Sequence, residues 1–493
     1  EQKMEKNQEV LKTSEEYLQA LKEMHPCIIK DKQLSKPYND EDIQKGVNVI
    51  ALSYDRAREE KYKEFMTVKS PITGKVINRF NHIAQNKEDL IKKHKMIHNL
   101  AKEVFCAQRC VGSDALQTLY DGTYRVDKSN KFETDYHKRF LKYLEYIQNN
   151  DIAPAGAIND AKGDRSISPS EQPERDSYVH IVKETDDGIY VSGIKTPITM
   201  SPYAEEIIVI PGLQFAEADK DCAVSFAIQT DAKGVEIYVL GPEVKTLKGD
   251  LSPTHGTKYL NKEGMVVFNN VFVPKERVFL CGEYKFAAAF ANTFATLHRF
   301  AYTACKPAVY ESMTGAAMLI SEYNGTKGEY FLSNTSEKIF EIYKTAILVR
   351  GLAKAAISDA KETESGTIMP DAVYANMGKY TSSEFFHHAI GILQDMAGNL
   401  PANLPYEDLL KDEKYKNQMK ALLSRKKGIS IEDQYALNEL IRVMVASNEG
   451  GLLQFGSKHG GGNKEAEKVA IYGNSLRNMH ACKNRIKDMS QKK

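Results

Sequence analysis

A chain of 493 residues is too long for one small core, so its length predicts two or three domains. Its 67 lysines and arginines nearly cancel its 66 aspartates and glutamates, which excludes a general basic surface for nucleic acid but not a local patch for a phosphorylated ligand. No run approaches the roughly 20 apolar residues of a membrane span, and seven scattered cysteines indicate a reducing cytoplasm rather than a disulfide framework.

The first part of the chain, residues 1–150, has the 3.6-residue period of helices. Thr13-Ser-Glu-Glu16 has the form of a capping box and predicts the start of a helix. The same periodicity predicts further helices over 40–65, 87–120 and 133–149. We therefore expect an N-terminal helical domain.

The pattern changes at about residue 151, where short extended runs are separated by glycine, proline and aspartate. Asp187-Gly188 is a hairpin turn signal between two such runs. The predicted strands cover 178–182, 189–191, 207–210, 223–228, 235–240 and 265–273. Residues 151–283 are thus expected to form a middle β domain.

Helical periodicity returns at about residue 284 and persists nearly to the end, with loops predicted at 323–325 and 398–401. Residues 284–493 are therefore expected to form a C-terminal helical domain. Runs of helices, then strands, then helices favour an α+β fold over a doubly wound sheet.

Two cysteines, Cys106 and Cys110, stand four residues apart inside the helical pattern of 87–120. On a helix they would project from the same face, about one turn apart. Cysteine is a common buried residue, so this pair alone favours core packing over metal binding.

A second segment adds two more donors. His298, Tyr302 and Cys305 stand at i, i+4 and i+7 of a predicted helix and therefore form one stripe. Three cysteines and a histidine suit either zinc or an iron–sulfur cluster. The missing C-x₂-C spacing of structural zinc sites favours the cluster, although a lone histidine on a helix face is more often a hydrogen-bonded core residue.

The remaining cysteines have no partner at ligand spacing. We interpret Cys222 as a core residue of a strand, and we assign no metal to the other three, Cys27, Cys281 and Cys482.

Six segments resemble the flavin-dependent 4-hydroxyphenylacetate 3-hydroxylase family, and within it the dehydratase and isomerase branch that carries an iron–sulfur cluster. The resemblance runs from about residue 13 to the C-terminal helix. The cysteine and histidine spacing is specific to this branch, since the flavin hydroxylases of the family lack the cluster. The segments are 77–80, 106–112, 162–165, 217–221, 266–274 and 298–306.

The resemblance implies an acyl-CoA dehydrogenase-like fold with a helical N-domain, a β-barrel-like middle domain and a helical-bundle C-domain. It implies a [4Fe–4S] cluster on Cys106, Cys110, His298 and Cys305. It also implies FAD near Ile158, Asn159, Lys162, Asp164, Arg165, Lys195 and Thr199. No G-x-G-x-x-G sequence predicts a Rossmann site for the flavin.

The implied activity is radical dehydration of a 4-hydroxyacyl-CoA, of the 4-hydroxybutyryl-CoA to crotonyl-CoA type, or migration of the double bond of vinylacetyl-CoA. His298 would be a ligand and also the base at C2, and Tyr302 would bind the substrate. Lys306 would bind a polar group or tune the cluster, Thr199 would adjoin the flavin, and Glu263 would be an active-site carboxylate. Because such a cluster has a ligand other than cysteine, we expect the enzyme to be sensitive to oxygen and its host to be anaerobic.

One departure from the branch concerns its second functional glutamate, which precedes a His-Gly-x-Gly turn. This chain has Gly456 there, ahead of His459-Gly-Gly-Gly462, and Gln454 where the branch has arginine. Glycine cannot transfer a proton, and Glu449 is seven residues away. The substrate therefore differs, or dehydration is lost while isomerisation or a related radical reaction remains.

Two other functions stay open from the residues alone. A flavin-dependent aromatic monooxygenase would need none of the four ligands, and a non-enzymatic protein could hold a structural zinc or a redox-sensing cluster. The resemblance also implies a homotetramer whose partner molecules are small acyl-CoA-like substrates.

Overall fold

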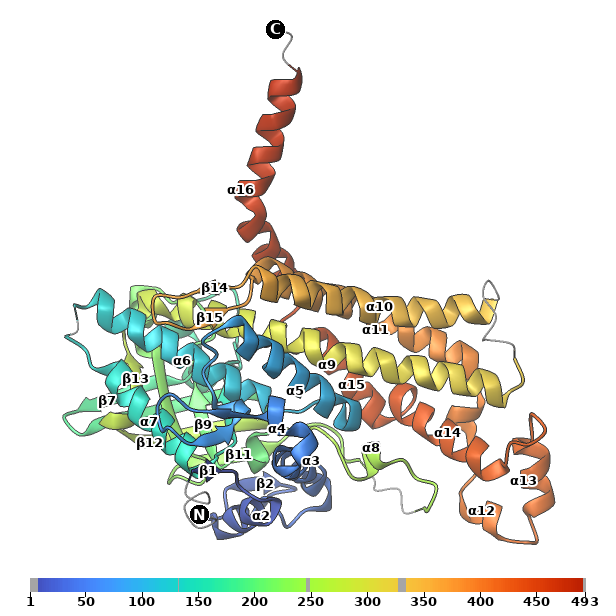
Figure 1. The fold of residues 1–493 in the computed structure, drawn as a ribbon. Coiled ribbons are helices and arrows are strands. Elements are labelled where there is room, and N and C mark those ends of the chain that lie inside the picture. The colour runs from blue at the N-terminus through green and yellow to red at the C-terminus, as the bar shows by residue number, and fades with distance from the viewer. Residues whose placement is uncertain (1–7, 132, 245–248, 327–333, 491–493) are drawn as a thin grey trace. The chain divides into compact units, whose positions relative to one another are not determined.

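The computed structural model describes residues 8–131, 133–244, 249–326 and 334–490 (Figure 1). The chain forms two compact units. The N-terminal unit holds the described residues of Glu1–Lys248, Thr254–Phe294 and Glu362–Ile368. The C-terminal unit holds those of Gly249–Pro253, Ala295–Lys361 and Met369–Lys493. The three domains expected from the sequence follow the order of helices and strands, and their boundaries stay a prediction.

Helices α2, α3 and α5 of the N-terminal unit begin where a side chain satisfies free N–H groups of the first turn. Thr13 and Glu16 form the predicted capping box ahead of α2, with bonds of 3.0 and 2.7 Å. Asp40 and Asn86 cap α3 and α5. The helices are α2 (Ser14–Glu23), α3 (Glu41–Arg58), α4 (Glu60–Met66), α5 (Lys87–Val104), α6 (Cys110–Ser129), α7 (Tyr136–Asn150) and the short α8 (Thr254–Thr257).

The strands form two main sheets, one in the order β13-β10-β9-β6 and one in the order β3-β2-β11-β12-β8-β7. The predicted hairpin at Asp187-Gly188 joins β7 to β8. The strands are β1 (Glu9–Val10), β2 (Ile28–Lys30), β3 (Gln33–Ser35), β4 (Thr67–Lys69), β5 (Val76–Asn78), β6 (Pro154–Ala157), β7 (His180–Thr185), β8 (Gly188–Thr199), β9 (Glu206–Val209), β10 (Val224–Gln229), β11 (Val235–Val239), β12 (Glu263–Pro274), β13 (Val278–Cys281), β14 (Lys361–Glu362) and β15 (Ile368–Met369).

Both faces of β9 are covered, which explains the apolar run that follows Glu206. Ile207 and Val209 join a core shared with α2, α3 and the larger sheet, while Ile208 and Ile210 pack into a second core with α6 and α7. Successive side chains of a strand point to opposite faces, so a strand between two cores has no polar side.

Both main sheets are open in the described chain, because each has two different strands at its edges. The expectation of a barrel-like middle domain is therefore wrong, and the fold is a mixed helix and sheet fold. The bulges of β8 and β12 bend the long hairpins without closing them into a barrel.

The predicted helix over 87–120 is also wrong, since it is broken at residues 105–109. Phe105 and Gln108 have φ of 60° and 63°, in the left-handed region that an α-helix excludes. Cys106 therefore lies in a loop, and Cys110 is the first residue of α6. The two thiols do not share a helix face as the four-residue spacing had implied.

The C-terminal unit is helical, as predicted. Helix α10 lies along α11, and α9 contacts both through the Arg350–Glu311 and Tyr310–Ser382 hydrogen bonds (Figure 1). No helix among the described residues is long and apolar enough to cross a membrane. The helices are α9 (Ala287–Tyr323), whose first eight residues belong to the N-terminal unit, α10 (Asn334–Ser358), α11 (Ala372–Ala397), α12 (Asp408–Lys411), α13 (Lys416–Leu423), α14 (Ile431–Val445), α15 (Asn448–His459) and α16 (Lys464–Ser490).

Candidate active site

The loop that carries Cys106 and Cys110 is held by its own buried arginine. The Arg109 guanidinium lies 4.5 Å from the ring centroid of Tyr54 and 4.9 Å from that of Phe80. It donates to Ser53 Oγ at 3.2 Å and pairs with Asp151 at 3.5 Å, and both charged side chains are 1% exposed. The left-handed loop is therefore fixed from inside the N-terminal unit.

The two thiols differ in their surroundings. Cys106 is half-buried in the loop, while Cys110 is buried at the N-terminus of α6, where the helix favours negative charge. Gly112, two residues further on, lets α6 approach β6 closely, because a Cβ there would meet Pro154 O at 2.0 Å. A half-buried and a buried thiol on a rigid support fit the thiolate ligands that a cluster needs.

The stripe predicted on α9 is confirmed as geometry. The rings of His298 and Tyr302 meet edge to face with centroids 5.4 Å apart, and Cys305 Sγ lies 3.8 Å from Tyr302 O. Burial raises the pKa of the Cys305 thiol, and the charges of Lys306 and Lys379 oppose that shift. His298 and Cys305, seven residues apart on one helix, are soft donors that fit a cluster, as Cys106 and Cys110 do.

Cys106 and Cys110 belong to the N-terminal unit, and His298 and Cys305 to the C-terminal unit. Among the described residues no three His, Cys, Asp or Glu side chains are already gathered as a metal site. The four-ligand set is therefore a proposal and is taken up below.

A glycine turn packs against the α9 stripe within the C-terminal unit. Tyr302 donates its hydroxyl hydrogen to Gly456 O at 2.9 Å, and a Cβ at Gly460 would lie 1.4 Å from that hydroxyl. Arg299 holds the turn by donating to Gly461 O at 2.8 Å and to Asn376 Oδ1 at 2.6 Å. The close approach explains why the turn is made of glycine.

A buried ion pair that the sequence analysis missed supports the same turn. Lys379 of α11 pairs with Glu467 of α16 at 2.8 Å, and both side chains are 0% exposed. Lys379 also donates to Ser383 Oγ at 2.6 Å and to Lys458 O at 3.1 Å. Burial lowers the pKa of Lys379, against the charge of Glu467. A lysine in a helical segment with the small residues Ala375, Gly378, Ser382 and Ser383 is the signal that could have revealed it.

Tyr302 lies between two cations. The ammonium groups of Lys306 and Lys379 stand 5.1 and 5.2 Å from its ring centroid. Such cations attract the π-face and favour negative charge that develops nearby. Lys306 is thus placed beside Tyr302, and its expected role toward a polar group or the cluster stays a prediction.

Gly456 is the departure noted above, and the space beside it is open. A Cβ at this position would have no other atom within 4 Å. Glu449 lies two turns earlier on α15, about 10 Å away along a helix that rises roughly 1.5 Å per residue. Glu449 therefore does not replace a carboxylate at position 456.

Thr199 and Glu263 meet across the β8–β12 ladder, where they are direct partners. Thr199 Oγ1 lies 3.0 and 3.1 Å from the two carboxylate oxygens, and Asn261 donates to Glu263 at 3.0 Å. Loss of hydration raises the pKa of Glu263, and the bonds from Thr199 and Asn261 only partly offset it. Such a carboxyl holds its proton to higher pH than an ordinary one and suits proton transfer.

Lys195, expected near the flavin, is used by the protein itself. Its ammonium pairs with Asp160 at 2.8 Å and donates to Ile158 O and Ile210 O at 2.9 and 3.1 Å. Thr196 N donates to Asn159 O at 2.9 Å. Lys195 therefore fixes the 158–160 segment against β8, and its side chain has no hydrogen-bonding direction turned to solvent.

The turn around Lys162 and Gly163 has two left-handed residues in succession, with φ of 74° and 53°. Gln172 braces it by accepting from Asp164 N at 2.8 Å and donating to Asp164 O at 2.6 Å. Asp164 and Arg165 are exposed at its tip. A rigid turn with exposed polar groups suits a charged ligand such as a pyrophosphate.

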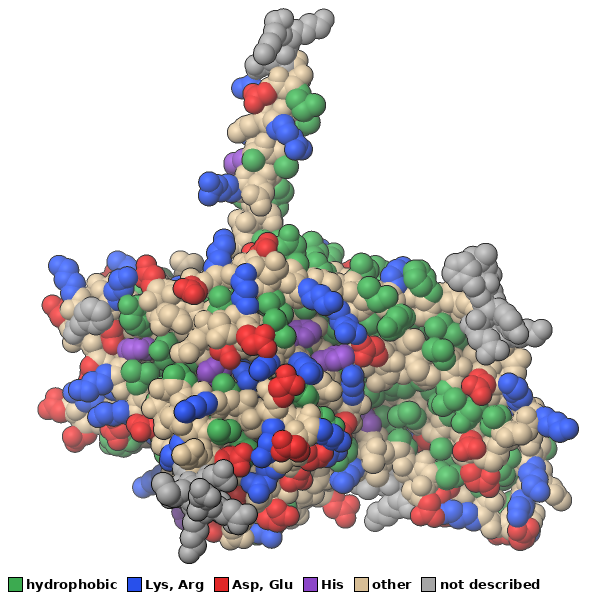
Figure 2. Space-filling view, in the orientation of Figure 1, with side chains coloured by type: hydrophobic (Ala, Val, Ile, Leu, Met, Phe, Trp, Pro, Cys, Tyr) green, Lys and Arg blue, Asp and Glu red, His purple; other side chains and the backbone are tan. Residues whose placement is uncertain are grey.

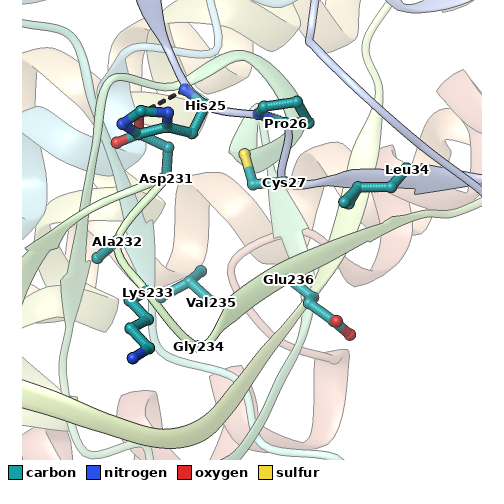
Figure 3. Close-up of a pocket in the computed structure, with 10 residues that line it drawn as sticks. All are labelled: His25, Pro26, Cys27, Leu34, Asp231, Ala232, Lys233, Gly234, Val235 and Glu236. Carbon is teal, nitrogen blue, oxygen red and sulfur yellow. Dashed lines mark hydrogen bonds between the residues drawn. The ribbon is translucent and has the colours of Figure 1, made fainter.

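A cavity of about 330 Å³ in the N-terminal unit is lined by none of these residues (Figure 3). Asp231 in it accepts from His25 N at 2.8 Å, and burial raises the pKa of Cys27 to about 12. Cys27 is thus a buried thiol of the apolar core. Cys222 is buried too, but it ends a 3₁₀ turn rather than lying in a strand.

Two family models cover most of the chain: the N-terminal region of 4-hydroxyphenylacetate 3-hydroxylase matches residues 13–280 and the C-terminal region matches 287–490. The 4-hydroxybutyryl-CoA dehydratase/vinylacetyl-CoA-Δ-isomerase of Clostridium aminobutyricum is 36% identical over 82% of each chain. The oxygenase component of 4-hydroxyphenylacetate 3-monooxygenase of Thermus thermophilus is 26% identical over 73% of each chain.

Among solved structures, an oxygen-tolerant archaeal 4-hydroxybutyryl-CoA dehydratase from N. maritimus superposes with a TM-score of 0.88. It is 30% identical and the match covers 96% of this chain and 95% of that one. An oxygenase component of 4-hydroxyphenylacetate 3-monooxygenase complexed with FAD superposes at 0.85, is 22% identical and matches over 97% and 99%. By its sequence along nearly its whole length, the chain belongs to the 4-hydroxyphenylacetate 3-hydroxylase family of enzymes.

Proposed function

We propose that the protein is a [4Fe–4S]- and FAD-dependent lyase that dehydrates a 4-hydroxyacyl-CoA, of the 4-hydroxybutyryl-CoA to crotonyl-CoA type, or isomerises vinylacetyl-CoA, or both. The observation that carries the proposal is the complete donor set, Cys106, Cys110, His298 and Cys305, in a chain 36% identical to a dehydratase/isomerase. We also propose that the fold is related to that of acyl-CoA dehydrogenases, as the sequence resemblance implies.

When bound, FAD supplies one-electron redox chemistry and the cluster supplies a Lewis-acidic iron. His298 would take the C2 proton, which the thioester makes acidic. The Tyr302 hydroxyl, which bonds Gly456 O at 2.9 Å, would turn to the substrate between the charges of Lys306 and Lys379. Glu263 would hold a second proton, with Thr199 fixing its carboxylate.

For FAD, the support is the pair of rigid segments beside β8. Ile158 and Asn159 are tied to β8 by Lys195 and Thr196, and the turn from Lys162 to Arg165 presents exposed polar groups. Thr199 ends the same strand, so one edge would contact the flavin along its length. Lys195 would act by holding this edge rather than by touching the cofactor.

Anaerobic purification tests the cofactors first, by iron, acid-labile sulfide and flavin content. The enzyme is then incubated separately with 4-hydroxybutyryl-CoA and vinylacetyl-CoA while crotonyl-CoA is followed by mass spectrometry. Crotonyl-CoA from both supports the full proposal, and product from vinylacetyl-CoA alone leaves an isomerase. Iron-free protein that hydroxylates a phenol when supplied with reduced flavin and molecular oxygen would establish the monooxygenase alternative. Zinc in place of iron would establish a structural metal.

Variants of Gly456 test whether the protein dehydrates 4-hydroxybutyryl-CoA or carries out a related radical reaction on another substrate. Because a side chain there meets open space, Gly456→Glu should fold with wild-type stability. If the missing carboxylate limits dehydration, this variant gains crotonyl-CoA formation from 4-hydroxybutyryl-CoA, while Gly456→Gln, its neutral control, does not. A wild-type enzyme already active on that substrate would show that the carboxylate is dispensable here.

For assembly we propose a homotetramer held in part by α16. Apolar residues Val469, Tyr472, Leu476, Met479 and Ile486 repeat along it at intervals of three, four or seven residues, and all are exposed. Figures 1 and 2 show this helix extending from the other C-terminal helices with apolar side chains along it. A cavity of about 430 Å³ between α11 and α16 includes Tyr472 and Met479.

A second copy of the chain is the occupant that such a repeat favours, since a periodic apolar stripe is buried well by another helix. Native mass spectrometry should find four chains in the wild-type assembly. Leu476→Glu with Met479→Glu should shift it to smaller species, whereas Asn474→Glu on the exposed polar side should not. A monomeric wild-type protein would overturn the assembly proposal.

A further inference from the structure

One buried hydroxyl joins the cysteine loop to the strand that carries Glu263. Tyr203 is 0% exposed and lies in the turn that follows β8. We propose that Tyr203 is a positioning residue that sets the loop of Cys106 and Cys110 in register with Glu263. This inference rests on the proposed function for the roles of the cysteines and the carboxylate, and on geometry within the N-terminal unit for the link.

On the loop side, Tyr203 donates its hydroxyl hydrogen to Gln108 Oε1 at 2.5 Å, and Gln108 Nε2 donates to Leu260 O at 3.3 Å. Gln108 is the left-handed residue between the two cysteines, and a non-glycine residue in that conformation persists only where its surroundings hold it. The hydroxyl therefore helps to hold the backbone that spaces the thiols.

On the strand side, the same oxygen accepts a hydrogen bond from Lys262 N at 3.1 Å, one residue before Glu263. Met200, which follows Thr199, donates its N–H to Lys262 O at 3.0 Å. The residues adjoining both members of the Thr199–Glu263 pair are thus tied to the Tyr203 turn. The Tyr203 hydroxyl thus donates one hydrogen bond to the loop and accepts one from the strand, which uses both its donor and an acceptor site.

The ring cannot move without disturbing α3. A Cβ at Gly46 would lie 2.3 Å from the Tyr203 ring, so helix and ring are in direct contact. Tyr17 donates to Tyr203 O at 2.7 Å, and Lys262 itself is held by an ion pair with Asp42 of α3 and by a 3.0 Å bond to Pro242 O. A rigidly placed hydroxyl transmits a shift of the loop to the strand instead of absorbing it.

The test is Tyr203→Phe, which keeps the ring and removes only the hydroxyl. Tyr310→Phe is the matched control, since Tyr310 is equally buried in the C-terminal unit and donates to Ser382 O at 2.7 Å. Amide hydrogen exchange should quicken about three- to tenfold at residues 105–110 and 260–263 together in Tyr203→Phe. It should not change there in Tyr310→Phe.

The cluster gives an independent readout. In Tyr203→Phe the electron paramagnetic resonance spectrum of the reduced cluster should change and iron should be lost faster on dilution, whereas Tyr310→Phe should match the wild type. If Tyr203→Phe does not fold, Gln108→Met breaks the same bond from the loop side. Faster exchange in only one of the two segments, or an unchanged cluster in an iron-loaded variant, overturns the inference. Iron-free wild-type protein would overturn the proposed function, and hydrogen exchange alone would then decide the link.

Discussion

The cysteine loop and the α9 stripe are each proposed to supply two ligands, yet they are built in opposite ways. On α9 one continuous helix places His298 and Cys305 just before Pro307, so the spacing comes mainly from the backbone itself. At 105–109 two left-handed residues break the helix, and the spacing depends on buried partners such as Arg109. A regular helix needs little outside help to present ligands, whereas a loop needs a fixed surrounding. Damage to distant partners should therefore affect the loop more.

The largest effect should come from removing a ligand on either side. Cys110→Ala and Cys305→Ala should each lower iron occupancy and activity by more than roughly 100-fold, because even outer partners of a metal site contribute 10- to 100-fold. Cys482→Ala, at an exposed cysteine, is the control and should keep both. Full iron content in either buried variant would remove that cysteine from the ligand set.

Replacing Arg109 should test whether the cysteine loop, unlike the α9 stripe, depends on buried partners. Arg109→Met leaves Asp151 buried without its charge partner, which costs about 3–5 kcal/mol of unfolding free energy. Urea denaturation measures that loss. Arg425→Met, at an exposed arginine outside the proposed sites, should change stability by less than about 0.5 kcal/mol. Equal stability of the two variants would show that the loop does not depend on its buried arginine.

The glycine turn beside Tyr302 tests the stripe in the same way. Gly460→Ala forces a methyl group against the Tyr302 hydroxyl and should destabilise the protein by about 1–3 kcal/mol. Gly456→Ala, four residues earlier in open space on α15, should be neutral or stabilising by up to about 1 kcal/mol. Thermal unfolding compares them, and a tolerated Gly460→Ala would mean that Tyr302 moves freely.

The smallest effect concerns Glu263 and should depend on pH. Since its folded-state pKa is raised, the native protein favours the protonated carboxyl, and stability falls as pH rises from the unfolded pKa through the folded one. Glu263→Gln should therefore gain stability relative to the wild type on going from pH 4 to pH 8, while losing activity. Glu276→Gln, at an exposed glutamate, is the control. A stability difference that stays constant across this range would contradict the raised pKa.

Periodic features were predictable from the sequence. The α9 stripe, the capping box at Thr13 and the β7–β8 hairpin follow from local spacing that directly specifies a helix, a helix start or a turn. The break at Phe105 was not predictable, because a left-handed residue other than glycine leaves no trace in hydrophobic periodicity. The Lys379–Glu467 and Tyr203–Gln108 contacts were also missed, since they join residues that lie 88 and 95 positions apart, respectively.

Glu467, near the start of α16, forms a buried ion pair with Lys379 of α11. The first turn of α16 and its exposed end should therefore differ in how readily a protease cleaves them. Opening the first turn would separate two charges with 0% exposure, whereas residues 480–490 are all exposed. Trypsin should therefore cut the unassembled chain after Arg477, Lys483 or Arg485 and spare the peptide bond at Lys464. The trimmed protein would lose part of the apolar stripe and keep the surroundings of Tyr302, so that chemistry and assembly could be measured apart in one polypeptide.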